Sequence, residues 1–139
     1  MTSICIDTNA YSEFQRGNRE AVAVVEAADH VWFPVISIGE LRAGFLNGRK
    51  LAHNEMMLGR FLGASAVSLA APSMDTSQMY AVIGTRLRAL GLPIPSNDIW
   101  IAASAMELDC PILTFDAHFK RIAGLRVVSC EHDWIRLHS

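Results

Sequence analysis

Short apolar runs alternate along the chain with longer segments in which apolar and polar residues are mixed. The apolar runs span 4–6, 31–34, 67–69, 112–115 and 127–128. Runs of this length are typical of strands, and the segments between them are long enough for helices. The alternation predicts an α/β protein, a three-layer α/β/α sandwich with a mainly parallel central sheet.

Helices are expected in the mixed segments, over 8–16, 19–28, 37–47, 51–63, 74–90 and 97–108. The fifth of these carries apolar residues at helical spacing, which should form one buried stripe. They are Met79, Val82, Ile83, Leu87 and Leu90. Gly91 should end this helix, and the prolines at 93 and 95 favour an extended connection to the next one.

The length and hydropathy of the chain limit its domain organisation and location. Its 139 residues suffice for one compact domain and are too few for two ordinary ones, so a single domain over 1–139 is expected. The hydrophobic fraction of 51% is high for a domain of this size, which indicates that a partner covers part of the surface. The longest uncharged stretch, 61–74, is too short to cross a membrane, and residues 1–9 lack the basic region of a secretory signal. A cytoplasmic protein without a membrane segment is therefore expected.

Cysteine spacing excludes two further classes of structure. Cys5, Cys110 and Cys130 are odd in number, widely separated and never arranged as C-x-x-C. This pattern argues against a disulfide framework and against a zinc site, so each cysteine is expected to be a small core residue.

Four acidic residues stand where predicted strands end or predicted helices begin. Asp7 follows the run 4–6, and Asp116 follows the run 112–115. Glu40 and Asp98 lie in the first turns of the helices expected after 36 and 96. In a parallel sheet, the carboxyl ends of strands and the amino ends of the following helices share one edge, where ligands bind. All four acids are therefore expected at that edge.

Each acid also has a purely structural interpretation. Asp7 and Asp116 could cap the segments that follow them. Ser37-Ile38-Gly39-Glu40 matches the capping box, in which the glutamate bonds back to the first backbone amide of a helix. Asp98 could do no more than interact favourably with the positive end of its helix dipole.

Four clustered carboxylates repel one another unless a cation neutralises them. Oxygen ligands favour Mg²⁺ or Mn²⁺ over zinc. A cation held there would lower the pKa of a bound water molecule and neutralise the charge that develops on a phosphodiester during in-line attack. The net charge of −2 does not oppose this chemistry, because the 12 Lys and Arg outnumber the acids that remain once these four are set aside.

Four motifs occur in a characteristic order through nearly the whole chain. They are Ile6-Asp7-Thr8-Asn9, Ser37-Ile38-Gly39-Glu40-Leu41-Arg42-Ala43-Gly44, Asn97-Asp98-Ile99-Trp100-Ile101-Ala102-Ala103 and Leu113-Thr114-Phe115-Asp116-Ala117-His118-Phe119. This ordered set resembles the PIN-domain family, and particularly its short bacterial members similar to VapC toxins of toxin–antitoxin pairs.

The resemblance implies a metal-dependent endoribonuclease toxin that inhibits translation by cutting transfer or ribosomal RNA, leaving a 5′-phosphate and a 3′-hydroxyl. It implies that the four acids hold Mg²⁺, or Mn²⁺, with Glu40 binding the metal or orienting the water. Supporting residues beside the metal would be Thr8, Asn9, Asn97 and Thr114. An antitoxin partner and a homodimer are also implied, and the apolar run Met56-Met57-Leu58 is consistent with such contacts.

Residues outside the four acids carry less specific signals. Basic side chains that could bind the RNA backbone are Arg42, Arg49, Lys50, His53 and Arg60, although a solvated helix face explains any single one of them better. His118, near Asp116, is a candidate general acid. The tryptophans at 32 and 100 and the six phenylalanines are expected in the core rather than as platforms for bases.

Two other functions remain open at this point. A phosphohydrolase or phospho-acceptor domain also places an Asp after the first strand of a parallel sheet. However, Asp7-Thr8-Asn9 lacks the second acid of a D-x-D pair, and no suitable late lysine follows. A non-catalytic protein could instead use its acidic groove to bind a basic partner.

Overall fold

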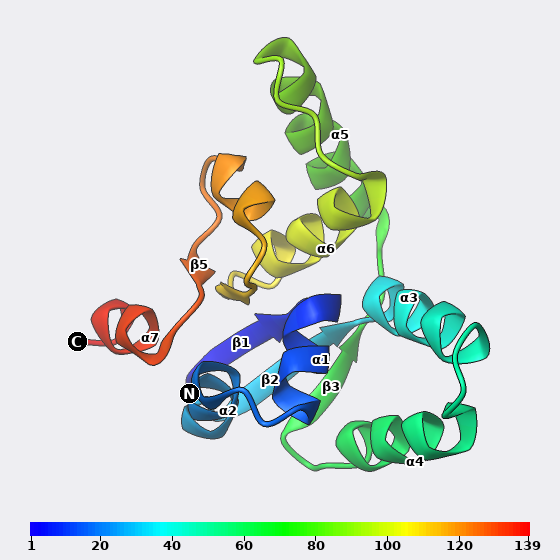
Figure 1. Ribbon diagram of the computed structural model, residues 1–139. Coiled ribbons are helices and arrows are strands. Elements are labelled where there is room, and N and C mark those ends of the chain that lie inside the picture. The colour runs from blue at the N-terminus through cyan, green and yellow to red at the C-terminus, as the bar shows by residue number, and fades with distance from the viewer.

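The computed structural model describes residues 1–139 and consists of a five-stranded sheet with helices on both faces (Figure 1). The strands are β1 (Ser3–Ile6), β2 (His30–Pro34), β3 (Val67–Ala70), β4 (Ile112–Leu113) and β5 (Val127–Val128). Their order is β3-β2-β1-β4-β5, and every neighbouring pair is parallel. The predicted α/β class with a parallel sheet is confirmed.

Seven α-helices and one 3₁₀ helix connect the strands. They are α1 (Thr8–Gln15), α2 (Arg19–Ala27), α3 (Val35–Leu46), α4 (Leu51–Leu62), α5 (Met74–Ala89), α6 (Ser96–Glu107), η1 (Ala117–Arg121) and α7 (Glu131–Leu137). None of the helices combines the length and the apolar character that a membrane crossing requires.

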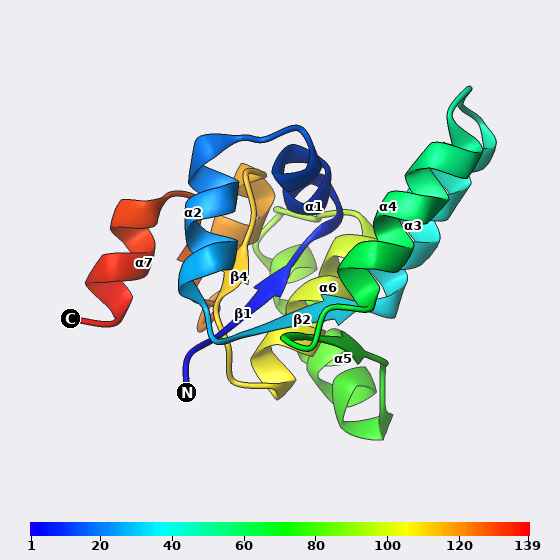
Figure 2. The ribbon, with the colours of Figure 1, turned by 90° about the horizontal axis from the view of Figure 1, so that it is seen from below.

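The alternation of side chains along β1 divides the core into two layers. Ile4 and Ile6 point to the side covered by α1, α2, α3, α4 and α7. Cys5 points to the opposite side, where Cys110 and the helices α5, α6 and η1 complete a second cluster. Figure 2 shows the ribbon from below, with α1 above the strands, α2 to their left and α3 and α4 to their right. All three cysteines are free thiols; Cys5 and Cys110 are buried as expected, whereas Cys130 is only partly buried, just before α7.

The fifth helix differs from expectation in how much of its stripe is buried. Ile83 and Leu87 are buried, whereas Val82 is 53% exposed and Leu90 is 61% exposed. The reason is that α5 packs chiefly against α6 and projects from the rest of the molecule (Figure 1). One neighbouring helix covers only a narrow stripe, so the prediction that Val82 and Leu90 are buried is wrong.

Two features near the carboxyl terminus also differ from the sequence analysis. The strand expected over 112–115 pairs only at Ile112 and Leu113, after which the chain turns towards η1. Helix α7 was not expected, and its Trp134 is buried in the same cluster as Ile4 and Ile6.

Candidate active site

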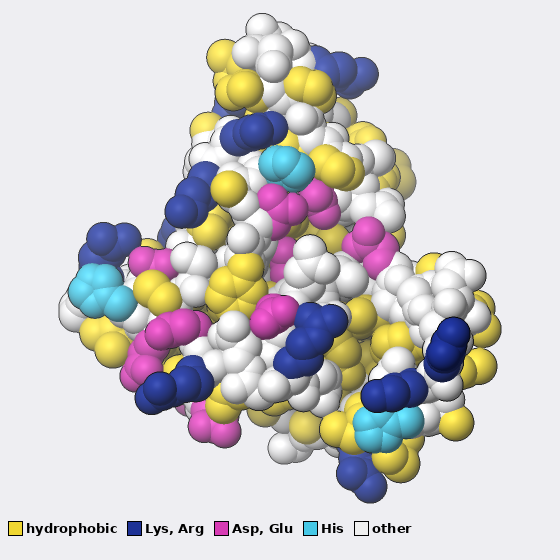
Figure 3. All heavy atoms as spheres, in the orientation of Figure 1, with side chains coloured by type: hydrophobic (Ala, Val, Ile, Leu, Met, Phe, Trp, Pro, Cys, Tyr) yellow, Lys and Arg dark blue, Asp and Glu magenta, His cyan; other side chains and the backbone are white.

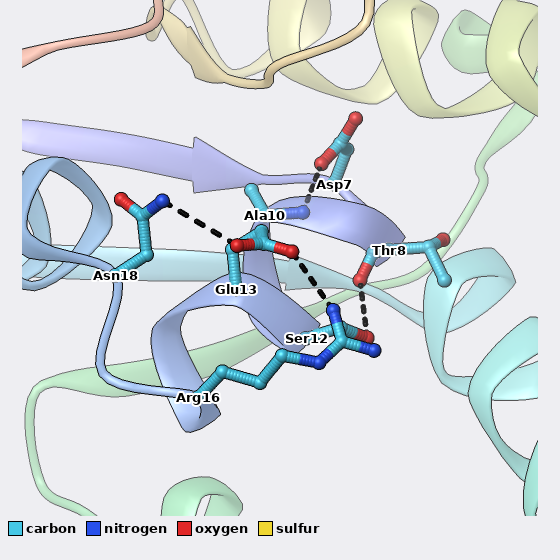
Figure 4. A network of polar contacts seen from close by, with 7 residues as sticks. All are labelled: Asp7, Thr8, Ala10, Ser12, Glu13, Arg16 and Asn18. Carbon is cyan, nitrogen blue, oxygen red and sulfur yellow. Dashed lines mark hydrogen bonds and ion pairs between the residues drawn. The ribbon is translucent and has the colours of Figure 1, made fainter.

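Asp7 follows β1 directly and is held in place by two hydrogen bonds. One carboxylate oxygen accepts the backbone N–H of Ala10 at 2.7 Å, which caps α1 (Figure 4). The other accepts the hydroxyl of Thr114 at 2.5 Å. The side chain is almost completely buried, so both the capping role and a place at the carboxyl edge of the sheet apply to the same residue.

Thr114 links Asp7 to the second acid that follows a strand. Its hydroxyl oxygen donates to Asp7 and accepts the backbone N–H of Asp116 at 3.0 Å. Asp116 in turn caps η1, because its Oδ1 accepts the backbone N–H of His118 at 2.9 Å. The imidazole Nδ1 of His118 lies 3.3 Å from the same oxygen.

Glu40 does not form the capping box that its sequence motif predicts. Helix α3 begins at Val35 after Pro34, and Ser37 lies inside the helix with a buried hydroxyl that has no hydrogen-bond partner. The carboxylate of Glu40 instead accepts the hydroxyl of Thr8 at 2.6 Å. This bond connects α3 to the beginning of α1, directly after Asp7, so the capping interpretation of Glu40 is wrong.

Asp98 lies in the first turn of α6, with no side chain capping that helix. Its carboxylate, that of Asp116 and the imidazole of His118 each offer a ligand atom, and these atoms lie within 4.8 Å of one another. Such spacing suits a single cation between three ligands. The sequence placed His118 near Asp116 alone, whereas in the structure it also lies beside Asp98.

Burial and mutual repulsion shift the pKa values of two of the acids. Burial raises the pKa of Asp7 to about 6, against the opposing hydrogen bonds from Thr114 and Ala10 and with a smaller contribution from the charges of Asp98 and Asp116. Burial, followed by the charges of Asp116 and Glu40, raises the pKa of Asp98 to about 6, while His118 opposes the shift. The acids therefore sense one another's charge, as members of one pocket should.

The donor set fits a divalent cation. The groups that converge here are carboxylates and one imidazole, and hard oxygen donors suit small divalent ions such as Mg²⁺ and Mn²⁺. A cation would also relieve the repulsion that raises the pKa values of Asp7 and Asp98. Figure 3 shows acidic side chains and one histidine together on this face, below α5 and above α1.

The expected supporting residues surround the acids at different depths. Thr114 is buried and Thr8 is partly buried, and each donates its hydroxyl to one of the four acids. Asn9 and Asn97 are exposed, the first in α1 after Thr8 and the second in α6 before Asp98.

The five basic candidates differ in their surroundings. Arg42 forms an ion pair with Glu55, with Nε 3.0 Å from Oε1. Lys50 and His53 line a groove with α1, whereas Arg49 and Arg60 are exposed outside that lining. These residues remain predictions for RNA contact.

Sequence analysis missed one residue in the groove beside α1 and one residue next to a motif acid. Arg16, at the end of α1, lines the groove opposite Lys50, and no local motif signalled this position. Phe115 is 38% exposed between Thr114 and Asp116, contrary to the expectation that all phenylalanines lie in the core. It lines a hollow with Asn9 and Asp116, and only the position of Phe115 beside a motif acid could have drawn attention to it.

Comparison with known proteins identifies this arrangement. The PIN domain family matches residues 4–125. Ribonuclease VapC4 of Mycobacterium tuberculosis is 30% identical over 95 residues, covering 68% of this chain and 73% of the relative. Plasmid stability protein StbB of Pseudomonas syringae pv. tomato is 28% identical over 91% of this chain and 96% of its own length.

The same fold occurs in the crystal structure of VapBC2 from Rickettsia felis bound to a promoter DNA fragment. The TM-score is 0.81 at 24% identity, over 91% of this chain and 98% of that chain. The chain therefore belongs to the PIN-domain family, and its resemblance to the VapC proteins is confirmed. This membership favours a nuclease over the phospho-acceptor alternative.

Proposed function

We propose that residues 1–139 form a single-domain endoribonuclease, the toxin of a toxin–antitoxin pair, which cuts RNA phosphodiester bonds at the pocket of Asp7, Glu40, Asp98 and Asp116. The convergence of four acids from separate segments of the chain carries this proposal. The similarity to Ribonuclease VapC4 supports RNA as the substrate.

Asp98 and Asp116, with Asp7 behind them, would hold Mg²⁺, for which Mn²⁺ could substitute. When bound, the ion supplies a water molecule of lowered pKa and positive charge beside the phosphate under attack. Thr114 and the Ala10 N–H fix the orientation of the Asp7 carboxylate.

Two residues at the rim of the pocket would position other groups, one the attacking water and the other a metal ligand. Glu40 is anchored by Thr8 through one oxygen and would orient the attacking water with the other. His118 would hold Asp116 in place through its Nδ1, which lies 3.3 Å from that carboxylate.

Two partners follow from exposed apolar residues. An antitoxin would cover apolar side chains at the hairpin of α3 and α4, where Leu46 is 71% exposed and Met56 is 46% exposed. A second copy of the chain would pack on α5, where Val82 and Leu90 are exposed. The protein would act in the cytoplasm, where transfer and ribosomal RNA are found.

The decisive experiment incubates the purified protein with a panel of transfer and ribosomal RNAs, with Mg²⁺ or with excess EDTA. The expected result is discrete cleavage with 5′-phosphate ends in Mg²⁺ and none in EDTA. Asp98→Asn should abolish it, while Asp75→Asn, a change at an exposed acid in the first turn of α5, should not. Equal cleavage by wild type and Asp98→Asn would refute the proposal.

A further inference from the structure

A basic groove opens between α1 and the corner that joins α3 to α4. It has a volume of about 510 Å³, with Arg16 on one wall and Lys50 and His53 on the other. Polar groups that can form hydrogen bonds to a ligand also line it, from Ser12, Gln15 and Asn54. Figure 3 shows Lys, Arg and His side chains over α1 and α4, below the acidic cluster.

One face of α1 connects this groove to the acidic pocket. Thr8, Ser12 and Gln15 follow one another at intervals of four and three residues, so they lie on the same side of the helix. Thr8 bonds to Glu40 of the pocket, and the Ser12 hydroxyl donates to the Thr8 carbonyl (Figure 4). Arg16 lies about 12 Å further along the helix axis than Thr8.

The charges of the groove are available to a ligand. No Asp or Glu lines it. The nearby Glu55 is engaged by Arg42, and the ion pair of Arg16 with Glu13 is on the surface, where such pairs contribute little. An incoming anion can therefore replace Glu13 as the partner of Arg16.

We propose that this groove binds backbone phosphates of the RNA on one side of the bond that is cut, through Arg16, Lys50 and His53. The proposal rests on the proposed ribonuclease function and defines where the RNA strand lies on one side of the cleaved bond. A phosphodiester chain with one phosphate at the acids and others along α1 reaches the groove without leaving the surface of that helix. Among the basic residues expected from the sequence, the geometry selects Lys50 and His53. Glu55 holds Arg42, and Arg49 and Arg60 lie outside the groove.

Salt dependence of RNA binding tests the proposal directly. Asp98→Asn protein, used to prevent cleavage, is titrated against a fluorescent single-stranded RNA of about 12 nucleotides, a length that spans such sites. Each lost phosphate contact should reduce the slope of log affinity against log salt by about 0.7. Arg16→Gln should therefore reduce the slope by about 0.7, and Arg16→Gln with Lys50→Gln by about 1.4. Arg86→Gln is the matched control, because Arg86 is exposed in the last turn of α5 outside the groove, and its slope should equal that of the parent.

Unchanged slopes in both groove variants, with thermal unfolding like that of the parent, would overturn the proposal. It would also be overturned if the variants kept normal RNA binding and lost only the binding of an acidic segment from the antitoxin. RNA cleavage by the wild type distinguishes failure of the groove proposal from failure of the nuclease proposal. RNA cleavage with unchanged slopes refutes the groove alone, whereas reduced slopes without any cleavage by wild type refute the nuclease and leave the groove supported.

Discussion

Replacing Asp7 with asparagine should stabilise the metal-free protein at neutral pH, although it removes a residue proposed to be essential for activity. The new side chain has nearly the same shape and can still cap α1 by accepting the Ala10 N–H. Its amide can donate to the Thr114 hydroxyl, which in the wild type donates to the Asp7 carboxylate. The substitution therefore removes a buried negative charge and keeps one hydrogen bond to Ala10 and one to Thr114, at the cost of the acceptor for the Thr114 hydroxyl proton.

The size of the gain follows from the pKa of Asp7. Burial raises that pKa from 3.8 to about 6, so ionisation above pH 6 costs the folded state about 3 kcal/mol relative to the unfolded chain. Between the two values the folded protein binds more protons than the unfolded chain, and wild-type stability falls as pH rises. The advantage of Asp7→Asn should be near zero at pH 4, grow through pH 5 and 6, and level off above pH 6 at about 2–3 kcal/mol.

Urea unfolding in EDTA, followed by tryptophan fluorescence at several pH values, measures this difference. Asp133→Asn provides a control of opposite sign. The Ser129 backbone N–H lowers the pKa of Asp133, so its charge stabilises the folded state at neutral pH and this contribution is lost as pH falls. Asp133→Asn should therefore be less stable than wild type at neutral pH and equal to it in acid.

Mg²⁺ should reduce the difference in stability between the two proteins. An ion that binds only the folded wild type stabilises it by mass action and relieves the repulsion at Asp7. The advantage of Asp7→Asn should shrink or vanish as Mg²⁺ is added. A difference that does not change with pH, or equal stabilisation of both proteins by Mg²⁺, would refute the reasoning.

Three further substitutions test separate parts of the structure. Thr114→Val should cost about 1–3 kcal/mol of stability in urea unfolding, because Asp7 and the Asp116 N–H lose a buried partner, while Thr114→Ser should be close to wild type. Trp134→Ala should cost about 3–5 kcal/mol, since the ring is buried beneath α7; a loss below 1 kcal/mol would show that α7 folds independently of the core. Phe115→Ala should weaken RNA binding by about 1–3 kcal/mol, the contribution of one stacked base, with thermal unfolding unchanged. A loss of folding stability instead of affinity would make Phe115 a structural residue.

The sheet was predictable because each strand contains a local apolar run, and in some cases a polar residue marks its end. Ile4 to Ile6 followed by Asp7 is such a case, and the structure ends β1 at that point. Helix α7 could not be predicted in the same way, because it has only seven residues and its stability depends on Trp134 reaching the core beside Ile4. The exposure of Val82 could not be predicted from the sequence either. Helical spacing shows that α5 has an apolar stripe, but it does not show how many neighbouring helices cover that stripe.

Contacts between distant segments were the least accessible to sequence reasoning. The bond between Thr8 and Glu40 joins residues 32 positions apart, and the groove of Arg16 and Lys50 exists only because α1 packs near α4. No local sequence pattern predicts that either pair of residues lies close together. The acids were predictable because Asp7, Asp98 and Asp116 lie at or beside the end of an element and Glu40 lies in the first half of α3. The topology of a parallel sheet brings these regions together without knowledge of individual contacts.

Glu40 shows why an incorrect local assignment can leave the predicted site intact. The capping box placed the start of the helix at Ser37, whereas the residue before the first turn of α3 is Pro34, three positions earlier. The earlier start adds nearly one helical turn before Glu40, which places it in the second turn of α3. What changes is the partner available to its carboxylate. The Glu40 carboxylate does not bond to the backbone amides of the first turn and bonds to Thr8 instead. This bond holds the Glu40 side chain near the other three acids.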